Sequence, residues 1–399
     1  MRIELAISGM PKTFNEPLFV GKPNIGNRER LGKLFEEILD SRWLTNNGAQ
    51  VQEFEKRLSE FLGVKHCIAT CNATIALEIA IKALGLKGKV IVPSFTFVAT
   101  VHALQWQGIE PTFCDVDPNT HNIDPHQVER LITPQTTGIM GVHLWGRGCD
   151  ASALRDIASA NDLSLLFDAA HAFGCSHRGQ MIGSLGDAEV FSFHATKFLN
   201  TFEGGAIATN SDELAGRIRL MKNFGFAGFD NVIYIGTNGK MSEISAAMGL
   251  VSLESMQDFV AVNKRNYHAY REGLQGVPGL AVLEYSAEEH NNYQYIVVEV
   301  DPKTSRISRD DLVEVLHAEN IIARRYFYPG CHRMEPYRTM GSALWPVPLR
   351  KTERLSEAVM ILPTGTAVDV GDIRKICGVV RHAIEHGPEV TALLAGLRD

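Results

Sequence analysis

A lysine follows an apolar run closely in the stretch VFSFHATKFLNTFEGGA, residues 190–206. The stretch begins like a core strand, with Val190, Phe191 and Phe193, and reaches Lys197 within a few residues. Burial lowers the pKa of a lysine towards the range in which its free amine attacks a carbonyl carbon, as a Schiff-base lysine must. A lysine that extends to solvent after a strand is the alternative, and it is the more common case for any single lysine.

An aspartate ends the preceding apolar run. Asp168 closes SLLFD, and a carboxylate on such a strand is buried only when it has a cationic or hydrogen-bonding partner. A protonated pyridine nitrogen would be a suitable partner. The alternative role for Asp168 is an ordinary turn or helix cap.

Two further stretches are suited to the phosphate and the ring of a small molecule. Asn72, Ala73 and Thr74 follow the run KHCIATC and open a helical pattern, where free backbone N–H groups favour a phosphate. Phe97 follows the run KVIVPS and offers an aromatic face to a planar ring. An ordinary helix cap and core packing are the respective alternatives. Together with the lysine and the aspartate, these residues are the components of a pyridoxal phosphate site.

Seven apolar runs between residues 65 and 210 predict the strands that would position these residues. Helical patterns lie between the runs, for example at 73–84 and 151–161, and fit crossover connections. We therefore expect an α/β fold with a seven-stranded, mostly parallel sheet between helices, and ligands bind at the carboxyl ends of such strands. The runs are KHCIATC, KVIVPS, PTFCDVD, GIMGVHLWG, SLLFDAA, AEVFSFH and GGAIATN.

A second, smaller α+β domain is expected in the C-terminal part, because 399 residues exceed the roughly 250–300 that one core supports. Helical patterns occur at 212–223 and 241–273, and the second is long enough to pass between domains. We expect a large domain over 1–255, including the N-terminal segment, and a small domain over 256–399. The small domain should contain a strand NYQYIVVEV, a helix introduced by Ser308, a strand IIARRYFY and a final helix from about Val370.

Composition excludes several classes of protein. Hydrophobic residues make up 45% and charged residues 21%, and no run approaches the roughly 18–20 apolar residues of a membrane span. The start MRIELAISGMPKTFNEP has no leader pattern, so we expect a cytoplasmic protein. A net charge of −7 without a dense Lys/Arg stripe argues against nucleic acid as a partner. The seven scattered cysteines indicate reduced thiols.

Metal and nicotinamide chemistry are not indicated either. His171, Cys175 and His177 lie close together in HAFGCSH, but such a triplet without a fourth ligand or an HExxH-type helix is weak evidence, so we expect no metal. No GxGxxG follows the first strand, which argues against a nicotinamide dehydrogenase.

A set of motifs resembles the sugar aminotransferases of the DegT/DnrJ/EryC1/StrS family, which are fold type I pyridoxal phosphate enzymes. The resemblance extends over nearly the whole chain and implies that Lys197 forms the Schiff base with the cofactor, while Asp168 pairs with its ring nitrogen. The motifs, in the family's order and spacing, are NATIALEIAIKAL, PSFTFVATVHAL, GVHLWG, LLFDAAHAFG, FSFHATKFLNTFEGGA and GTNGKMSEISAAMG.

The same resemblance implies roles for further residues. Phe97 would cover the ring, and Asn238 would reach the phosphate from the partner subunit, so that the active unit is a homodimer with shared active sites. His332, Tyr326 and Asn47 lie in stretches where family members contact the sugar or the nucleotide. The residues implied to bind the phosphate within one subunit are Asn72, Ala73, Thr74 and Ser192.

Three positions of this chain can be compared with the family pattern. His171 stands where many members carry Gln, near the phenolic oxygen of the cofactor, and Phe97 replaces a common Trp. Both keep a polar or planar group, so we expect the site to be retained. The family includes dehydratases in which histidine replaces the Schiff-base lysine, and Lys197 at this position favours transamination.

The substrate is also suggested by resemblance. The runs FVGKPNIGNRE, WLTNNG and ARRYFYPGCHRMEPYR resemble members that aminate C4 of dTDP-4-keto-6-deoxyglucose, with L-glutamate as donor, to give dTDP-4-amino-4,6-dideoxyglucose. A 3-keto nucleotide-sugar aminotransferase is the main alternative. A pyridoxal phosphate-binding regulatory protein without turnover is a second alternative, although the chain shows no basic DNA-reading module.

Overall fold

The seven predicted strands form one sheet in the computed structural model, which describes residues 4–398. Their order is β2-β10-β9-β6-β5-β3-β4. Strand β10 is antiparallel to both of its neighbours, and the other neighbouring pairs are parallel. The prediction of a mostly parallel seven-stranded sheet is confirmed. The strands are β2 (His66–Thr70), β3 (Lys89–Pro93), β4 (Glu110–Cys114), β5 (Thr136–Val142), β6 (Ser164–Asp168), β9 (Ala188–Ser192) and β10 (Gly205–Thr209).

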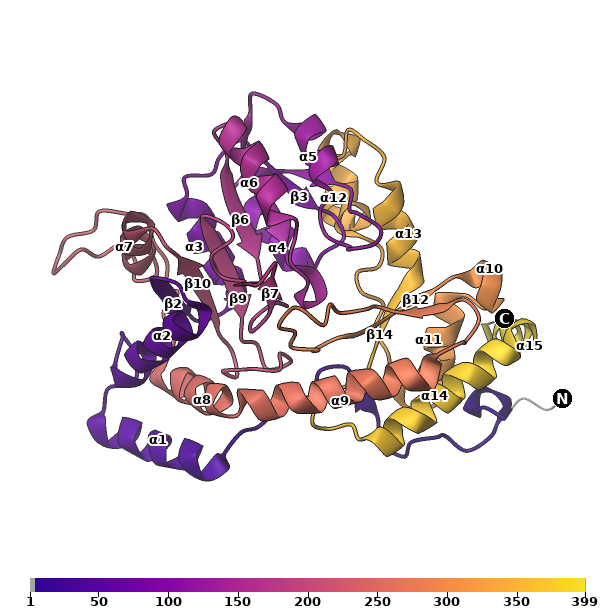
Figure 1. Cartoon of the computed structure of the whole chain (residues 1–399). Coiled ribbons are helices and arrows are strands. Elements are labelled where there is room, and N and C mark those ends of the chain that lie inside the picture. Colours follow the sequence, from indigo (N-terminus) through magenta and orange to yellow (C-terminus); the bar gives the residue numbers. More distant parts are fainter. Residues whose placement is uncertain (1–3, 399) are drawn as a thin grey trace.

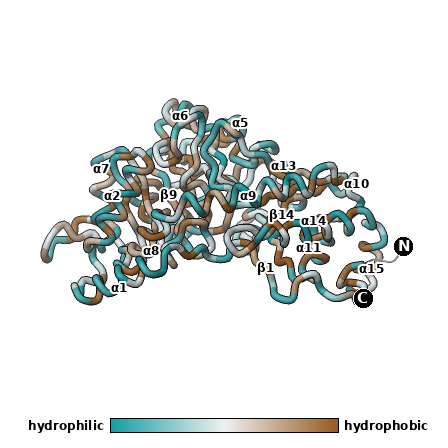
Figure 2. The backbone as a smooth tube through the Cα atoms, turned by 60° about the horizontal axis from the view of Figure 1, so that its bottom comes forward, coloured by the Kyte–Doolittle hydropathy of each residue, from teal (hydrophilic) through white to brown (hydrophobic). Residues whose placement is uncertain are grey.

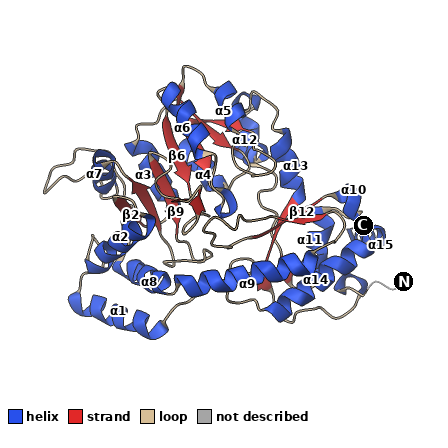
Figure 3. Ribbon diagram, in the orientation of Figure 1, coloured by secondary structure: helices blue, strands red, loops and turns tan. Residues whose placement is uncertain are grey.

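Helices cover both faces of this sheet (Figure 3). Successive side chains of a strand point to opposite faces, and on β6 and β9 both faces are apolar. Phe167 and Phe191 belong to one core cluster, whereas their neighbours Leu166 and Val190 belong to the cluster on the other side. Continuous hydrophobic runs are therefore needed here. The helices that contribute to these two clusters include α2 (Ala49–Leu62), α3 (Ala73–Ala83), α4 (Val98–Gln105), α5 (Pro125–Leu131), α6 (Ala151–Ala160) and α7 (Asp212–Met221).

The predicted helix over 241–273 is two helices in the structure, α8 (Glu243–Glu254) and α9 (Met256–Leu274), which meet at Ser255. Ser255 has φ −97° and ψ 2°, outside the α-helical region, so the prediction of one continuous helix is wrong at this residue. Helix α9 runs along one side of the molecule from the sheet towards the C-terminal part, where it lies beside α14 (Val370–Glu385) (Figure 1).

The C-terminal part is built on a three-stranded antiparallel sheet of order β11-β12-β14. The predicted helices beginning after Ser308 and at Val370 are present, and the Ser308 side chain caps the first by accepting a hydrogen bond from the Asp311 N–H. The elements are β11 (Leu280–Val282), β12 (Ile296–Val300), α10 (Pro302–Ser305), α11 (Arg309–Ala318), α12 (Glu335–Met340), α13 (Arg350–Ala358), β14 (Val359–Leu362), α14 and α15 (Gly387–Arg398).

The predicted strand over 321–328 is wrong beyond its first residues. Only Ile321–Ile322 forms a strand, β13, and it pairs in parallel with β1 (Leu18–Phe19). Further along, the Tyr328 N–H donates to the Arg325 carbonyl, so the chain turns where the apolar pattern suggested extension. The remaining elements are the helix α1 (Arg28–Ser41), the hairpin β7 (Ser176–His177) and β8 (Gln180–Met181), and short 3-10 helices at Ala6–Ser8, Leu144–Gly146, Cys331–Arg333 and Ser342–Leu344.

The N-terminal segment packs on the C-terminal part. Leu5 and Phe14 are buried in the core cluster that also contains Ile296, Leu312 and Ile376. In this packing residues 4–19 associate with residues beyond 260, whereas the division of the chain at residue 255 stays a prediction. Among residues 4–398, no helix combines the length and the apolar character that crossing a membrane requires.

A buried ion pair joins α2 to α7 beside β2. Glu55 accepts hydrogen bonds from Lys222 Nζ at 2.8 Å, from Arg219 Nη1 at 2.6 Å and from the Ala69 N–H at 2.9 Å. Burial alone would raise the pKa of Glu55, but the charges of Lys222 and Arg219 hold it below its ordinary value. The carboxylate is therefore ionised and fully bonded, and it fixes the strand that leads to Asn72.

We predict that Glu55→Ala lowers the free energy of unfolding by about 3–5 kcal/mol, because it leaves the buried Lys222 ammonium without its partner. Urea denaturation followed by circular dichroism measures this. The matched control is Glu53→Ala on the same helix, which removes an exposed pair with Arg57 and should change the value by less than about 1 kcal/mol. Equal losses in both variants would contradict the role of the buried pair.

Candidate active site

A cavity of about 420 Å³ lies at the carboxyl edge of the large sheet. Asn72 follows β2, Asp168 ends β6 and Ser192 ends β9, so three strands bring polar side chains to one place. Other walls come from far along the chain: Gly21 belongs to the N-terminal segment and Tyr295 to the C-terminal part. The cavity is thus closed by segments from both ends of the chain.

Lys197 lies in this cavity, in the turn that follows β9. Its Nζ donates a hydrogen bond to the Tyr295 hydroxyl at 3.0 Å. Burial lowers the pKa of Lys197 from its usual value to about 8, although the Asp168 charge works in the opposite direction. About a tenth of the amine is then unprotonated at pH 7, far more than for an ordinary lysine, and the free amine is the form that attacks as a nucleophile.

Asp168 faces the cavity from the end of β6 and is held by two donors. The Thr100 hydroxyl donates to Oδ2 at 2.7 Å, and the Ala170 N–H donates to Oδ1 at 3.0 Å. Burial raises the pKa of Asp168, and these hydrogen bonds together with the Lys197 charge oppose that rise. A buried carboxylate oriented in this way favours a cation in front of it.

His171 completes one wall next to the lysine. Its Nδ1 accepts a hydrogen bond from the Trp145 N–H at 3.4 Å, so in its neutral form the ring proton is on Nε2. The ring lies 4.3 Å from that of Tyr295 and is stacked on that of Trp145 at 5.6 Å. Burial, reinforced by the Lys197 charge, lowers the pKa of His171 well below its usual value. His171 is therefore a neutral hydrogen-bond donor in the cavity.

The opposite end of the cavity is suited to an anion. Helix α3 begins there, and the Asn72 side chain caps it by accepting from the Ile75 N–H at 2.8 Å. The N–H groups of the first helical residues, Ala73 and Thr74, have no partner within a helix and give its start a positive character. Gly205 permits the close approach of β10, since a Cβ atom there would lie 2.8 Å from the Ala73 nitrogen.

Phe97 precedes α4 and also lines the cavity. It is 56% exposed, which is unusual for a phenylalanine. Tyr326 lies among the residues around the same cavity, with the Arg324 guanidinium 5.5 Å from the centre of its ring.

Three residues expected from the resemblance lie outside this lining. Asn238 is exposed, and its side chain accepts a hydrogen bond from Lys240 Nζ at 2.7 Å. Asn47 is exposed just before α2, and its carbonyl accepts from Gln52. His332 is buried behind β3, where its Nδ1 is 2.7 Å from the Ser94 hydroxyl. The substrate and partner roles of these residues stay predictions.

The structure adds residues that the sequence reasoning missed. Tyr295 contacts the lysine across a separation of 98 residues, and Thr100 orients the aspartate across 68. A signal existed for Thr100, because a hydroxyl one helical turn beyond Phe97 in PSFTFVAT should face the same side. Tyr295 had no local signal. Other residues that line the cavity are Val20, Thr96, His194, Thr196, Glu203, Arg324 and Phe327.

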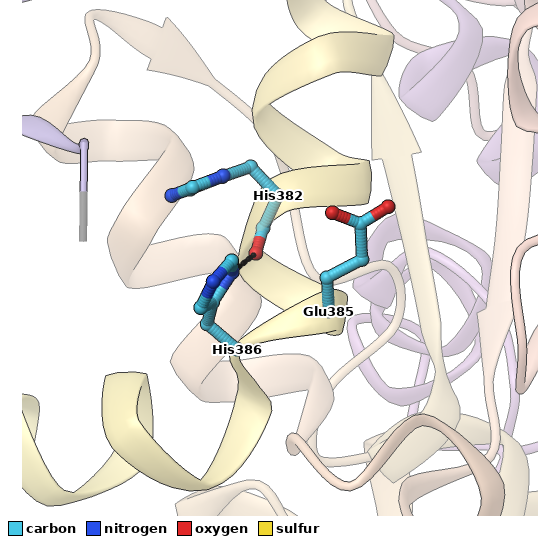
Figure 4. Close-up of side chains that lie close together, drawn as sticks. All are labelled: His382, Glu385 and His386. Carbon is cyan, nitrogen blue, oxygen red and sulfur yellow. Dashed lines mark hydrogen bonds between the residues drawn. The ribbon is translucent and has the colours of Figure 1, made fainter. Parts of the chain in front are cut away.

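A group of potential metal ligands lies elsewhere, on the last turn of α14 (Figure 4). One ligand atom from each of His382, Glu385 and His386 lies within 4.8 Å of the others. Two of these ring nitrogens are already bonded: His386 Nδ1 donates to the His382 carbonyl at 3.0 Å, and His382 Nε2 accepts from the Glu4 N–H at 3.1 Å. These residues do not line the cavity.

The two histidines and the cysteine of HAFGCSH do not form a metal-binding group in the described part of the structure. Within residues 4–398, His171, Cys175 and His177 do not form a group of close ligand atoms. His171 faces the cavity instead. The expectation of a metal-free site stays a prediction.

Comparison with known proteins identifies the class to which this fold and site belong. A family model described as the DegT/DnrJ/EryC1/StrS aminotransferase family matches residues 26–381. The chain therefore belongs to the DegT/DnrJ/EryC1/StrS aminotransferase family, and the resemblance seen in its motifs is confirmed.

Individual relatives cover almost the whole chain. A dTDP-4-amino-4,6-dideoxy-D-glucose transaminase of Shigella dysenteriae is 40% identical over 366 residues, which is 92% of this chain and 99% of the relative. A GDP-perosamine synthase of Caulobacter vibrioides is 34% identical over 363 residues, covering 90% of this chain and 95% of the relative. The crystal structure of DesI, analysed in the presence of its TDP-sugar product, has a TM-score of 0.94, is 50% identical and covers 99% of both chains.

We predict that Asp168→Asn lowers the pKa of Lys197 below about 8, because the aspartate charge that favours the ammonium form is removed. In protein stripped of bound small molecules, acetylation of Lys197 should therefore proceed faster at pH 7, as measured by peptide mass spectrometry over a pH series. The control is Glu203→Gln, an exposed carboxylate in the same cavity, for which no change is expected. An unchanged or higher pKa in Asp168→Asn would contradict the proposed charge coupling.

Proposed function

We propose that this enzyme transfers the amino group of L-glutamate to C4 of dTDP-4-keto-6-deoxy-D-glucose, with pyridoxal 5'-phosphate as cofactor. The products would be dTDP-4-amino-4,6-dideoxy-D-glucose and 2-oxoglutarate. The observation that carries the proposal is a desolvated lysine beside a buried carboxylate, in a chain 40% identical to a transaminase named for this amino sugar.

The residues of the cavity fit pyridoxal phosphate. Its phosphate would lie at the start of α3, near the Ala73 and Thr74 N–H groups and the Ser192 hydroxyl, where Gly205 leaves room. Its ring nitrogen would be the cation that the Asp168 carboxylate favours. The ring would lie between those two ends, covered by Phe97 and next to the His171 proton donor.

The cofactor, when bound, supplies an aldehyde that carries the amino group and a ring that accepts electron density from the donor's Cα. Lys197 Nζ, whose pKa is about 8, accepts and returns a proton at the reacting carbon near neutral pH. Asp168 remains an anion when a cation stands in front of it, and Thr100 keeps its carboxylate in that orientation. Neutral His171 offers its Nε2 proton to an oxygen on the ring.

The active unit in this proposal is a homodimer, to which a protruding loop contributes. The segment between α7 and α8 extends away from the body of the molecule (Figure 1), and hydrophobic residues recur along it (Figure 2). Exposed apolar residues on such an extension favour contact with another protein surface. Asn238 lies at the base of the same segment, and we assign it to the phosphate of the partner subunit. The exposed apolar residues are Phe224, Phe226, Phe229, Val232, Ile233 and Ile235.

The remaining details of the proposal rest on resemblance. His332, Tyr326 and Asn47 are assigned to the sugar nucleotide. A cytoplasmic location is part of the same proposal. Two alternatives keep the family and change the substrate: a 3-keto sugar, or a GDP-linked sugar, since the Caulobacter relative is named a GDP-perosamine synthase.

We predict that purified protein with pyridoxal phosphate, L-glutamate and dTDP-4-keto-6-deoxy-D-glucose forms 2-oxoglutarate and an amino sugar in equal amounts. Mass spectrometry of the nucleotide sugar and an enzymatic 2-oxoglutarate assay measure both products. Lys197→Ala should abolish turnover, since the proton-transferring amine is removed, and Lys197→Arg is the matched control that keeps charge without a free amine.

Other results of this assay separate the alternatives. If glutamate converts the cofactor but the 4-keto sugar is unchanged, the C4 proposal is wrong, and 3-keto and GDP-linked sugars are tested in the same assay. If glutamate does not convert the cofactor, the glutamate donor is wrong and other amino acids are tested; conversion by none of them refutes transamination and supports the regulatory alternative.

We predict that Gly205→Ala weakens binding of pyridoxal phosphate by 10-fold or more, because the added Cβ would lie 2.8 Å from the Ala73 nitrogen and displace the start of α3. The dissociation constant is measured by quenching of tryptophan fluorescence. Gly216→Ala on α7 is the control, since a Cβ there meets no atom within 4 Å, and its cofactor affinity should be unchanged. Wild-type affinity in Gly205→Ala would refute the phosphate position.

A further inference from the structure

The hydroxyl of Tyr295 is a direct hydrogen-bond partner of the Lys197 amine. Lys197 Nζ donates to Tyr295 Oη at 3.0 Å, and Tyr295 is only 6% exposed. The tyrosine comes from the C-terminal part, immediately before β12, and reaches the lysine across the cavity. The lysine and its partner therefore belong to different parts of the molecule.

Tyr295 is fixed from several sides. Its ring lies 4.3 Å from that of His171 and meets Trp145 edge-on at 5.4 Å. Its backbone carbonyl accepts a hydrogen bond from the Tyr285 hydroxyl at 3.1 Å, and that hydroxyl also lies 3.1 Å from the Trp145 carbonyl. A side chain held in this way presents its hydroxyl at one defined point.

The hydroxyl can serve the lysine in both of its protonation states. Burial raises the pKa of Tyr295 well above its usual value, so the phenol stays neutral at any pH at which the enzyme works. A phenol accepts a hydrogen bond from an ammonium group and donates one to a neutral amine. Asp168, His171 and Tyr326 are titratable groups that also line the cavity here, and none of them is hydrogen-bonded to Nζ in the structure.

We propose that Tyr295 is a positioning residue that holds the Lys197 amine at the reacting centre whenever it is free of the cofactor. This inference rests on the proposed function, since transamination requires the lysine to leave the cofactor and then to carry a proton. A free lysine side chain has many rotamers, and proton transfer requires its nitrogen in one place. The Tyr295 hydroxyl, which comes from the C-terminal part and not from the large sheet, restricts the rotamers of Lys197.

The first test is kinetic and uses the holoenzyme. Tyr295→Phe removes the hydroxyl and keeps the ring, so kcat should fall about 10- to 100-fold while the KM for each substrate changes less than about 3-fold. The primary isotope effect with α-deuterated glutamate should rise, because proton transfer becomes rate-limiting. Tyr293→Phe, a neighbouring buried tyrosine whose ring packs against Tyr267 and Tyr285, is the control and should retain wild-type kcat.

The second test does not depend on turnover. In cofactor-free protein, the pH dependence of Lys197 acetylation reports its pKa. A hydrogen bond to an ammonium is stronger than one to a neutral amine, so its loss in Tyr295→Phe should move the pKa of Lys197 below about 8. If the substitution merely loosened the packing, water would enter and the pKa would rise towards its ordinary value.

The two tests together decide the proposal. A lower pKa, which supplies more free amine, combined with a lower kcat supports positioning. Wild-type kcat in Tyr295→Phe overturns it, as does a raised pKa or an equal loss in Tyr293→Phe. If wild-type enzyme fails to aminate the sugar, the function proposed above is wrong, and the acetylation test still reports whether Tyr295 holds the lysine.

Discussion

A buried carboxylate sets the conditions for the rest of this structure. Asp168 ends an apolar strand, and burial works against its charge, so it needs fixed donors and a nearby cation. Thr100 and the Ala170 N–H provide the donors. Burial that raises the pKa of the Asp168 carboxyl also lowers the pKa of the Lys197 amine. One buried environment therefore acts on both groups.

Burial of these two groups requires packed residues around them, and the fold provides this packing because both faces of its sheet are covered by core clusters. At the carboxyl edge of the sheet, the C-terminal part contributes aromatic side chains. Trp145, Tyr295 and Phe327 pack together, with the rings of Trp145 and Phe327 stacked 5.3 Å apart. These rings pack beside the lysine, and the Tyr295 hydroxyl among them accepts a hydrogen bond from its amine.

Much of this was predictable from the sequence, because the strands are mostly apolar and several of them, among them β2, β3, β6 and β9, end at or shortly before a residue that lines the cavity. The seven strands, the ends at Asp168 and Ser192, and the helix start after Asn72 all follow from local patterns. Ser255 was missed because a single serine between two apolar helical patterns does not mark a break. The turn after Arg325 was missed because its apolar residues fill the cavity wall rather than a strand.

Contacts between distant parts of the chain could not be predicted in this way. Nothing near Tyr295 in NYQYIVVEV indicates a lysine almost a hundred residues earlier, and the resemblance to a family implied cofactor roles for Lys197 and Asp168 without indicating this neighbour. The contact between the His332 ring and Ser94 is likewise not indicated by the local sequence, and the substrate role that the resemblance implies for His332 stays a prediction. Long-range packing, not composition, determines which of these side chains meet.

The pairing of β1 with β13 also has a consequence for how the protein is made. Leu18 lies opposite Ile321. Strand β1 therefore cannot pair until β13, about three hundred residues later, has been synthesised. Val20 and Gly21, which line the cavity, follow directly after β1. The large sheet has all of its strands by residue 209, well before synthesis ends. On the ribosome, the nascent chain can therefore assemble its scaffold early, whereas a competent pocket forms only near release, when the leading segment docks on the tail.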